Sequence, residues 1–260
     1  MNPNYLGLVA LCLSLLVFWV VQTLLRVRPA RIRVFWLLFF SILAIPSFLF
    51  AFYYAHLLPE WEWFYELRSI HGSEFLVVFL GAALGTGASL LHCRLRGFLL
   101  LALLALGGVP YLKPFLRPLP EMAFRDRWKG NACLQSTSST CGPAAVCTIL
   151  RYLGYSATER EVARAAYSGS TGTEAWYLAR YVREKGFTAQ FRFGNTVSPQ
   201  TELPAVVGVR FGGVGHFIAV LKMEDGDVIF VDPLVGEERL PLDSFLKRYQ
   251  FTRFSLWIGK

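Results

Sequence analysis

The sequence predicts an α-helical transmembrane region followed by an α+β domain with an antiparallel sheet. Nearly all long apolar runs lie in residues 1–112, whereas residues 113–260 have the mixed composition of a soluble domain. In that second part, helix-like patterns come first and strand-like segments follow, an order typical of α+β domains. We therefore divide the chain into a transmembrane region at 1–112, a linker at 113–127 and a globular domain at 128–260.

The composition favours a membrane protein over a nucleic-acid-binding protein. Hydrophobic residues make up 54% of the chain and charged residues 17%, which is more apolar than a typical soluble protein. The formal net charge is +8, but the sequence contains no zinc-finger spacing, recognition-helix pattern or aromatic–basic repeat. Much of the positive charge lies beside apolar runs, where it sets membrane orientation. The lipid bilayer is therefore an expected partner, and nucleic acid is not.

Four apolar stretches are candidate membrane spans. A spanning helix needs roughly 20 mostly apolar residues because the hydrocarbon core is about 30 Å thick. The first two stretches meet this length, the third is slightly short and the fourth is the shortest. In the third, Gly81 and Gly85 form a small-xxx-small pair that permits close helix packing. The stretches run from about Tyr5 to Leu25, Val34 to Leu58, Phe75 to His92 and Gly97 to Leu112.

Basic residues predict the side of the membrane on which each loop lies. Four arginines from Arg26 to Arg33 fill the first loop, and Arg94 and Arg96 lie in the third, so both loops are expected in the cytoplasm. The second loop is acidic and aromatic, which favours the outer face. If the fourth stretch spans, the globular domain also lies outside. The basic residues that follow this stretch, beginning with Lys113, favour the cytoplasm instead. We expect the outer face, and the cytoplasmic alternative remains open.

Capping and turn residues predict the elements of the globular domain. A proline in the first turn and a glycine beyond the last turn mark the first helix, and a capping-box spacing marks the start of the second. The expected helices are Cys141–Leu153, Thr158–Tyr167 and Thr173–Lys185. The expected strands are Phe187–Phe193, Ala205–Arg210, His216–Lys222, Val228–Val231 and Phe251–Trp257.

A cysteine and a histidine are the candidate reactive residues. His216 is the only histidine of the globular domain, so any histidine-dependent reaction there must use it. Cys141 is predicted at a helix N-terminus, where unpaired N–H groups and the helix dipole favour a thiolate. Gly142 and Pro143 keep bulky side chains away from the thiol. The plain alternatives are a packed histidine and a structural thiol, the role that Cys147 inside the helix is expected to have.

Two further residues fit the same site. Gln135 lies six residues before Cys141, and its amide can complement the Cys141 backbone N–H in an oxyanion hole. Asp232 lies sixteen residues after His216, across a predicted turn at 225–226. A two-residue turn alone would place these two side chains on opposite sheet faces, whereas a three-residue turn or a bulge would place them on one face. We expect one face, so that the carboxylate of Asp232 orients the imidazole.

The segment QSTSSTCGPAAVCTIL, which contains Gln135 and Cys141, resembles the bacteriocin-processing, double-glycine leader peptidases, a branch of the papain-like cysteine proteases. GHFIAV around His216 and VDPLVG around Asp232 match that family's other two blocks, and the resemblance covers about residues 125–260. It implies a papain-like fold and catalytic roles for Cys141, His216 and Asp232. It also implies that Gln135 belongs to the oxyanion hole. The implied substrate is a peptide, typically cut after a pair of small residues in a leader.

The chain departs from the best-known members of that family in its organisation. Those members have the domain at the N-terminus of an ATP-driven exporter, whereas here it follows the apolar stretches. The sequence contains no GxxxxGK[ST] phosphate loop, which excludes ATP-driven transport by these residues and makes a separate transporter a candidate partner. The expected function is a cysteine peptidase anchored in the bacterial cytoplasmic membrane, which cleaves peptide or protein precursors without a metal or cofactor.

Alternative functions use the same residues. A catalytically silent module would bind a peptide and present a precursor to a separate transporter, but the presence of all four site residues favours the peptidase. Acyl or peptidyl transfer would proceed through the same thioester as hydrolysis, and the sequence does not separate the two reactions. A disulfide between Cys133 and Cys147 is a further alternative for these two residues.

Overall fold

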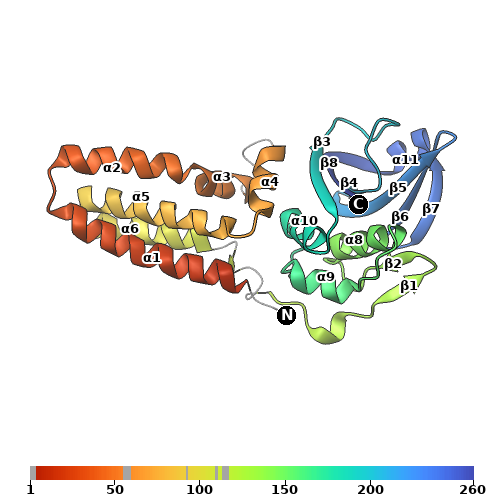
Figure 1. Ribbon diagram of the computed structural model, residues 1–260, viewed down its shortest axis with the longest axis horizontal. Coiled ribbons are helices and arrows are strands. Elements are labelled where there is room, and N and C mark those ends of the chain that lie inside the picture. Colours follow the sequence, from red (N-terminus) through yellow and green to blue (C-terminus); the bar gives the residue numbers. More distant parts are fainter. Residues whose placement is uncertain (1–3, 55–59, 92, 109–110, 113–116) are drawn as a thin grey trace. The chain divides into compact units, whose positions relative to one another are not determined.

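The chain forms two compact units in the computed structural model (Figure 1). One unit is helical and comprises residues 4–60 and 71–116; the other comprises Trp61–Ile70 and Arg117–Lys260. The sequence-based division assigned the segment Trp61–Ile70 to the membrane region, and the structure places it in the globular unit instead. The structure describes residues 4–54, 60–91, 93–108, 111–112 and 117–260.

Two helices of the helical unit are long and apolar enough to cross a membrane. They are α1 (Tyr5–Arg26) and the continuous helix made of η1 (Ser73–Leu76) and α5 (Val77–Leu90). These two helices correspond to the first and third predicted stretches. Spans at the other two stretches remain a prediction, because neither stretch forms a single helix of that length within the described residues.

The second predicted stretch is divided into two helices. It forms α2 (Ala30–Leu43) and α3 (Ile45–Tyr54), with a turn at Ala44 between them. Pro46 gives the physical reason, because proline has no N–H to donate to the preceding turn and its ring crowds that turn. The predicted end of this stretch at Leu58 lies outside the described residues.

The fourth predicted stretch leads the chain back along α5. It forms α6 (Cys93–Leu103) and a π-helical turn, η2 (Leu104–Gly108). In the middle of α6, the Leu99 side chain lies 3.5 Å from the position of a Cβ built on Gly87, close to the end of α5. Beyond η2, the Tyr111 hydroxyl donates a 3.3 Å hydrogen bond to the carbonyl of Glu74, just before α5 begins. The fourth stretch and α5 are therefore antiparallel neighbours.

Helices α1 and α5 pack with their backbones in close contact. A Cβ on Gly81 would lie 2.3 Å from the carbonyl oxygen of Ser14, and one on Gly85 would lie 2.4 Å from that of Phe18. The Ser14 hydroxyl also donates a 2.8 Å hydrogen bond to the Val77 carbonyl. The predicted role of the two glycines in close helix packing is confirmed.

The globular unit is an α+β domain built on a six-stranded antiparallel sheet, which confirms the predicted class. The strands are β3 (Thr188–Phe193), β4 (Ala205–Phe211), β5 (Val214–Glu224), β6 (Asp227–Asp232), β7 (Gly236–Pro241) and β8 (Gln250–Gly259), in the order β3-β8-β4-β5-β6-β7. The other elements are α4 (Glu62–Ser69), η3 (Glu121–Ala123), β1 (Arg127–Lys129), β2 (Ala132–Leu134), α8 (Cys141–Tyr152), α9 (Glu159–Ala165), α10 (Ala175–Glu184) and α11 (Leu242–Arg248).

Helices cover both faces of the large sheet (Figure 1). On one face, Phe245 of α11 joins a buried cluster that includes Ile218 of β5 and Phe230 of β6. On the other face, α8 lies against β5, where a Cβ on Gly142 would lie 3.2 Å from the Phe217 ring. Adjacent residues of β5 thus serve opposite faces, and α8 is held directly against the strand that contains His216.

We expect the substitution Gly85→Ala to loosen the helical unit, because the new methyl group would meet the rigid backbone of Phe18. Overpacking of this kind costs about 1–3 kcal/mol. Thermal unfolding of the full chain in detergent should show a Tm lowered by roughly 2–10 °C. Gly87→Ala is the matched control, because its methyl group would meet only a side chain at 3.5 Å. Equal effects of the two substitutions would contradict the packing argument.

Candidate active site

Cys141 is the first residue of α8 and is partly exposed. The residue before it, Thr140, does not cap the helix with its side chain; its hydroxyl donates instead to the Thr137 carbonyl at 3.1 Å. The positive end of the helix dipole therefore faces the sulfur without a competing side-chain oxygen from the cap residue.

His216 and Asp232 are joined by a hydrogen bond of 2.9 Å between Nε2 and Oδ1. The β5–β6 hairpin has a two-residue turn, in which Asp225 and Gly226 both have positive φ. The register then shifts between Val220 and Lys222, which is a β-bulge. Without the bulge, the two side chains would lie on opposite faces. Of the two predicted solutions, the structure uses the bulge.

Asp232 is buried, and its carboxylate accepts hydrogen bonds from three groups. Oδ1 also accepts from the backbone N–H of Leu234 at 2.9 Å, and Oδ2 accepts from the hydroxyl of Tyr249 at 2.7 Å. Burial by itself would raise the pKa of Asp232, but the hydrogen bonds from His216, Leu234 and Tyr249 outweigh it and lower the pKa. The carboxylate therefore stays ionised beside the imidazole.

The same network favours a charged imidazole at His216. Burial works against the imidazolium, but hydrogen bonds to Asp232 and to Cys141 outweigh it and raise the pKa of His216 from 6.5 to about 9. Because Nε2 is bound to Asp232, Nδ1 is the ring nitrogen left to face the thiol. The thiol, the imidazole and the carboxylate thus form one connected chain of interactions.

Gln135 is buried next to this chain. Its backbone N–H donates to the carbonyl of Pro233 at 2.9 Å, which ties it to the residue after Asp232. Its side-chain Nε2 donates to the Thr137 carbonyl at 2.7 Å, and its Oε1 accepts no hydrogen bond from the described residues. A primary amide has two N–H groups, so one remains for a ligand. All four predicted site residues therefore belong to one region of the fold.

Sequence reasoning missed two supporting residues, Tyr249 and Glu159. Tyr249 follows α11 and is held in the core cluster, so its bond to Asp232 depends on an element that was not predicted. Glu159 is fully buried at the start of α9 and accepts hydrogen bonds from the backbone N–H (2.7 Å) and the hydroxyl of Ser136. It thereby fixes the loop between Gln135 and Cys141. The helix start predicted at Thr158 was the one available signal for Glu159.

Cys133 and Cys147 are both buried and both free thiols, so the structure does not contain the disulfide considered from the sequence. Burial, together with a hydrogen bond to Cys133, raises the pKa of Cys147 well above its ordinary value. The Cys133 backbone N–H donates to the hydroxyl of Thr148 at 3.0 Å. A buried thiol with a raised pKa is unreactive, which agrees with the structural role predicted for Cys147.

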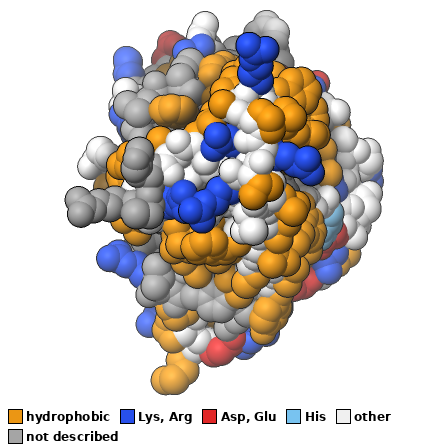
Figure 2. All heavy atoms as spheres, turned by 90° about the vertical axis from the view of Figure 1, so that its left-hand side faces the viewer, with side chains coloured by type: hydrophobic (Ala, Val, Ile, Leu, Met, Phe, Trp, Pro, Cys, Tyr) orange, Lys and Arg blue, Asp and Glu red, His pale blue; other side chains and the backbone are white. Residues whose placement is uncertain are grey.

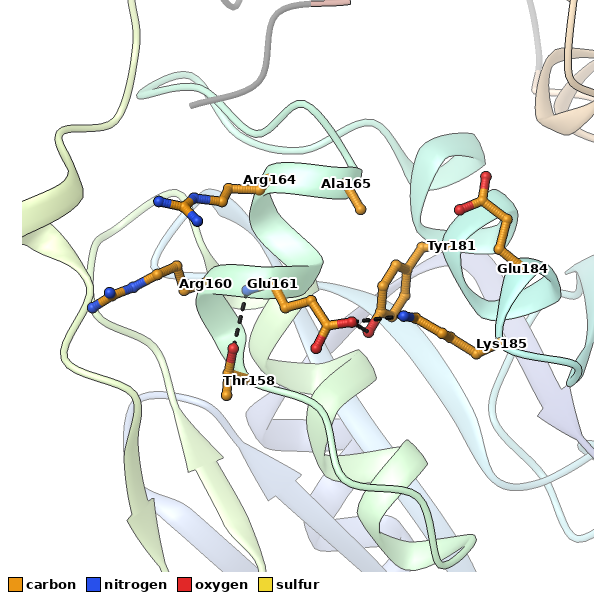
Figure 3. A pocket seen from close by; sticks show the side chains of 8 residues that line it. All are labelled: Thr158, Arg160, Glu161, Arg164, Ala165, Tyr181, Glu184 and Lys185. Atoms are coloured by element: carbon orange, nitrogen blue, oxygen red, sulfur yellow. Dashed lines mark hydrogen bonds and ion pairs between the residues drawn. The ribbon is translucent and has the colours of Figure 1, made fainter.

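A surface hollow of about 530 Å³ lies between α9 and α10 (Figure 3). Its central charged group, Glu161, accepts a 2.8 Å hydrogen bond from the Tyr181 hydroxyl and lies 2.7 Å from Nζ of Lys185. Burial opposes ionisation of Glu161, but these two partners outweigh it and lower its pKa. The hollow is lined by none of the four predicted site residues. We regard it as an internally paired charge cluster that joins the two helices.

Comparisons with known proteins agree with the domain architecture. The model of the Peptidase C39 family matches residues 129–258, half of the chain. An uncharacterized protein of Methanothermobacter marburgensis is 33% identical over 113 residues, which are 44% of this chain and 78% of that protein. A probable functional amyloid protease, FapD, of Pseudomonas fluorescens is 29% identical over 133 residues, which are 48% of this chain and 59% of FapD.

Two solved structures are similar to part of this chain. One is a double glycine motif protease from an AMS/PCAT transporter in complex with the leader peptide (TM-score 0.43, 21% identity, 52% of this chain and 94% of that one). The other is the peptidase domain of Streptococcus ComA (TM-score 0.41, 16% identity, 48% and 95%). With the family model matching half of the chain, residues 129–258 identify this protein as a member of the Peptidase C39 family.

Proposed function

We propose that this protein is a membrane-anchored cysteine peptidase that cleaves peptide or protein precursors. The observation that supports this best is the connected chain from Cys141 through His216 to Asp232, which has the parts of an activated nucleophile. The apolar helices are the proposed anchor, and the sequence-based orientation puts the domain on the outer face. A separate transporter is a candidate partner.

In the first half of the proposed reaction, the Cys141 thiolate attacks the carbonyl carbon of the scissile bond. The negative charge that develops on the carbonyl oxygen is stabilised by the Cys141 backbone N–H and by the N–H of Gln135 that is not bound to Thr137. His216 then gives its Nδ1 proton to the leaving amine. The amine departs and a thioester to Cys141 remains.

In the second half, His216 takes a proton from water, and the resulting hydroxide attacks the thioester carbonyl. The carbon–sulfur bond breaks, the acid product leaves and the thiolate is restored. Throughout both halves, Asp232 holds the imidazole in place through Nε2, and the Tyr249 hydroxyl holds the carboxylate. Tyr249 is accordingly a positioning residue, because it acts through Asp232.

Thiol alkylation tests the nucleophile without a known substrate. In detergent-solubilised protein at pH 7, an iodoacetamide probe should label Cys141 rapidly in the wild type. The Cys141→Ala chain, which retains the exposed Cys12, gives the slow background rate, because Cys133 and Cys147 are buried. His216→Ala should react roughly 10- to 30-fold more slowly, since an ordinary thiol is only a few per cent ionised at this pH. Slow labelling of the wild type that His216→Ala does not change would favour a silent peptide-binding module.

The protonation of His216 should depend on the carboxylate of Asp232. The imidazolium contributes stability fully below pH 6.5 and loses it as the pH rises through about 9. In Asp232→Asn, the His216 pKa should fall by more than about one unit toward 6.5. NMR titration of ¹³C-histidine-labelled protein, assigned with His216→Ala, measures this. Tyr249→Phe keeps the carboxylate and should retain a raised pKa; an unchanged pKa in Asp232→Asn would refute the coupling.

Gln135 should matter for cleavage and not for alkylation, because alkylation forms no oxyanion. We expect Gln135→Ala to label at the wild-type rate and to cleave a peptide found by library screening about 10²- to 10³-fold more slowly. Both rates are measured on the same preparation. A parallel loss of labelling would mean that Gln135 instead supports the fold of the loop before Cys141.

A further inference from the structure

Helix α4 comes from the loop between the second and third apolar stretches, yet its apolar side chains are buried in the globular unit. Phe64 and Tyr65 are each only 3% exposed. The Tyr65 ring lies 5.2 Å from the ring of Phe191 on β3 and 5.7 Å from that of Phe254 on β8, measured between centroids. It also lies 5.6 Å from the ring of Trp176 on α10. Tyr65 is thus part of an aromatic core that residues 117–260 do not complete by themselves.

Two glutamates of α4 bind the free edge of the sheet. β3 is the outermost strand, and the carboxylates of Glu66 and Glu62 accept hydrogen bonds from the backbone N–H groups of Phe191 (3.0 Å) and Phe193 (2.9 Å). Residues four apart on a helix are about 6 Å apart along its axis, and residues two apart on a strand are separated by nearly the same distance. The spacing of the glutamates therefore matches that of the outward N–H groups, and α4 closes this sheet edge.

Two arginines of α10 bind the C-terminal end of α4. The buried guanidinium of Arg180 donates to the carbonyls of Arg68 (3.1 Å), Ser69 (3.3 Å) and Ile70 (3.0 Å). The guanidinium of Arg183 forms an ion pair of 2.5 Å with Glu66. Cations at the C-terminus satisfy unpaired carbonyls and the negative end of the helix dipole. Both ends of α4 are therefore bound by polar partners in the globular unit.

Within the helical unit, the two basic loops lie at the same end. Arg33, at the start of α2, donates a 2.6 Å hydrogen bond to the carbonyl of Ser89 near the end of α5, and Arg96 donates to the carbonyl of Leu91. Figure 2 shows basic side chains gathered among apolar ones on the face turned to the viewer, which is the side of Figure 1 where the α1–α2 turn lies. The opposite end of α5 is the one contacted by Tyr111, at the end of the fourth stretch.

We propose that α4 is a docking helix that fixes the catalytic domain on the outer face of the membrane. The chain leaves α4 at Ile70 and re-enters the globular unit at Arg117. Because α4 and the rest of this unit lie on the same side of the membrane, the segment 71–116 must cross the membrane an even number of times. With the predicted span at the fourth stretch, the antiparallel pairing of this stretch with α5 provides two crossings. With the arginine-rich loops in the cytoplasm, α4 and the domain lie outside. This inference rests on the proposed peptidase function, and it implies that the substrate of the enzyme has already crossed the membrane.

Of the five basic residues from Lys113 to Lys129, four lie in the folded globular unit, which resumes at Arg117. Arg127 and Lys129 form β1 and so belong to the folded globular unit. Charges within large domains have little influence on topology, whereas those in short loops dominate it. The first loop has four arginines and no acidic residue.

Cysteine labelling in spheroplasts tests the sidedness on the full chain. Every variant contains Cys141→Ala, and the unsubstituted Cys141→Ala chain gives the background from the natural cysteines. Single cysteines are introduced at three exposed positions: directly after α4 (Ile70→Cys), elsewhere in the globular unit (Gln200→Cys) and in the first loop (Arg28→Cys). A membrane-impermeant maleimide should label the first two equally before and after lysis. It should label Arg28→Cys only after lysis.

Protection of either Ile70→Cys or Gln200→Cys before lysis, or labelling of Arg28→Cys before lysis, would overturn the inference. None of these readouts involves catalysis, so a failed alkylation test of the proposed peptidase would leave the sidedness result intact.

A second measurement tests the docking. Limited proteolysis of the globular unit should be about tenfold faster in Tyr65→Ala, which removes a buried ring, and nearly unchanged in Trp63→Ala, whose side chain is 50% exposed. Equal rates would overturn docking.

Discussion

The hydrogen bond between His216 and Asp232 is the interaction on which the rest of the site depends. It requires two side chains on neighbouring strands to lie on one sheet face, and the bulge between Val220 and Lys222 makes this possible. It also requires a buried carboxylate to remain charged, which is costly unless the charge is paired and hydrogen-bonded. The backbone of Leu234 and the hydroxyl of Tyr249 meet that requirement. The contacts around Asp232 therefore keep its carboxylate ionised and do not involve the substrate directly.

This arrangement has opposite consequences for the two members of the pair as the pH changes. The pKa of Asp232 is lowered, so its contribution to stability is present above its ordinary value near 3.8 and is lost as the pH falls through the lowered value. The pKa of His216 is raised to about 9, so its contribution is present below 6.5 and declines on the alkaline side. The two contributions overlap from mildly acidic to neutral pH. That is the range in which the charged pair stabilises the folded domain.

The sequence predicted the residues of the candidate site better than the elements that support them. Cys141 and His216 could be found because their residue types, the helix start and the single histidine point to one chemistry. The sequence predicted either a three-residue turn or a bulge between His216 and Asp232, because side chains alternate between the two sheet faces along each strand. The strand β7, by contrast, has the polar sequence GEERLP, and α11 is only seven residues long, so neither has a clear periodic pattern. The contacts of α4 join residues more than a hundred positions apart, a separation that periodicity and capping rules do not address.

The acidic second loop illustrates why such long-range contacts change the interpretation of a sequence. Its glutamates were first interpreted as a sign of the outer face, but Glu62 and Glu66 are bound to the edge of β3, which is reason enough for their presence. The proposed orientation therefore depends on the arginines of the first and third loops and on the number of proposed membrane crossings between α4 and Arg117. In the proposed topology, α4 ties the domain to the loop before α5, so a domain in the cytoplasm would require the whole helical unit to be reversed. The four arginines of the first loop oppose that reversal.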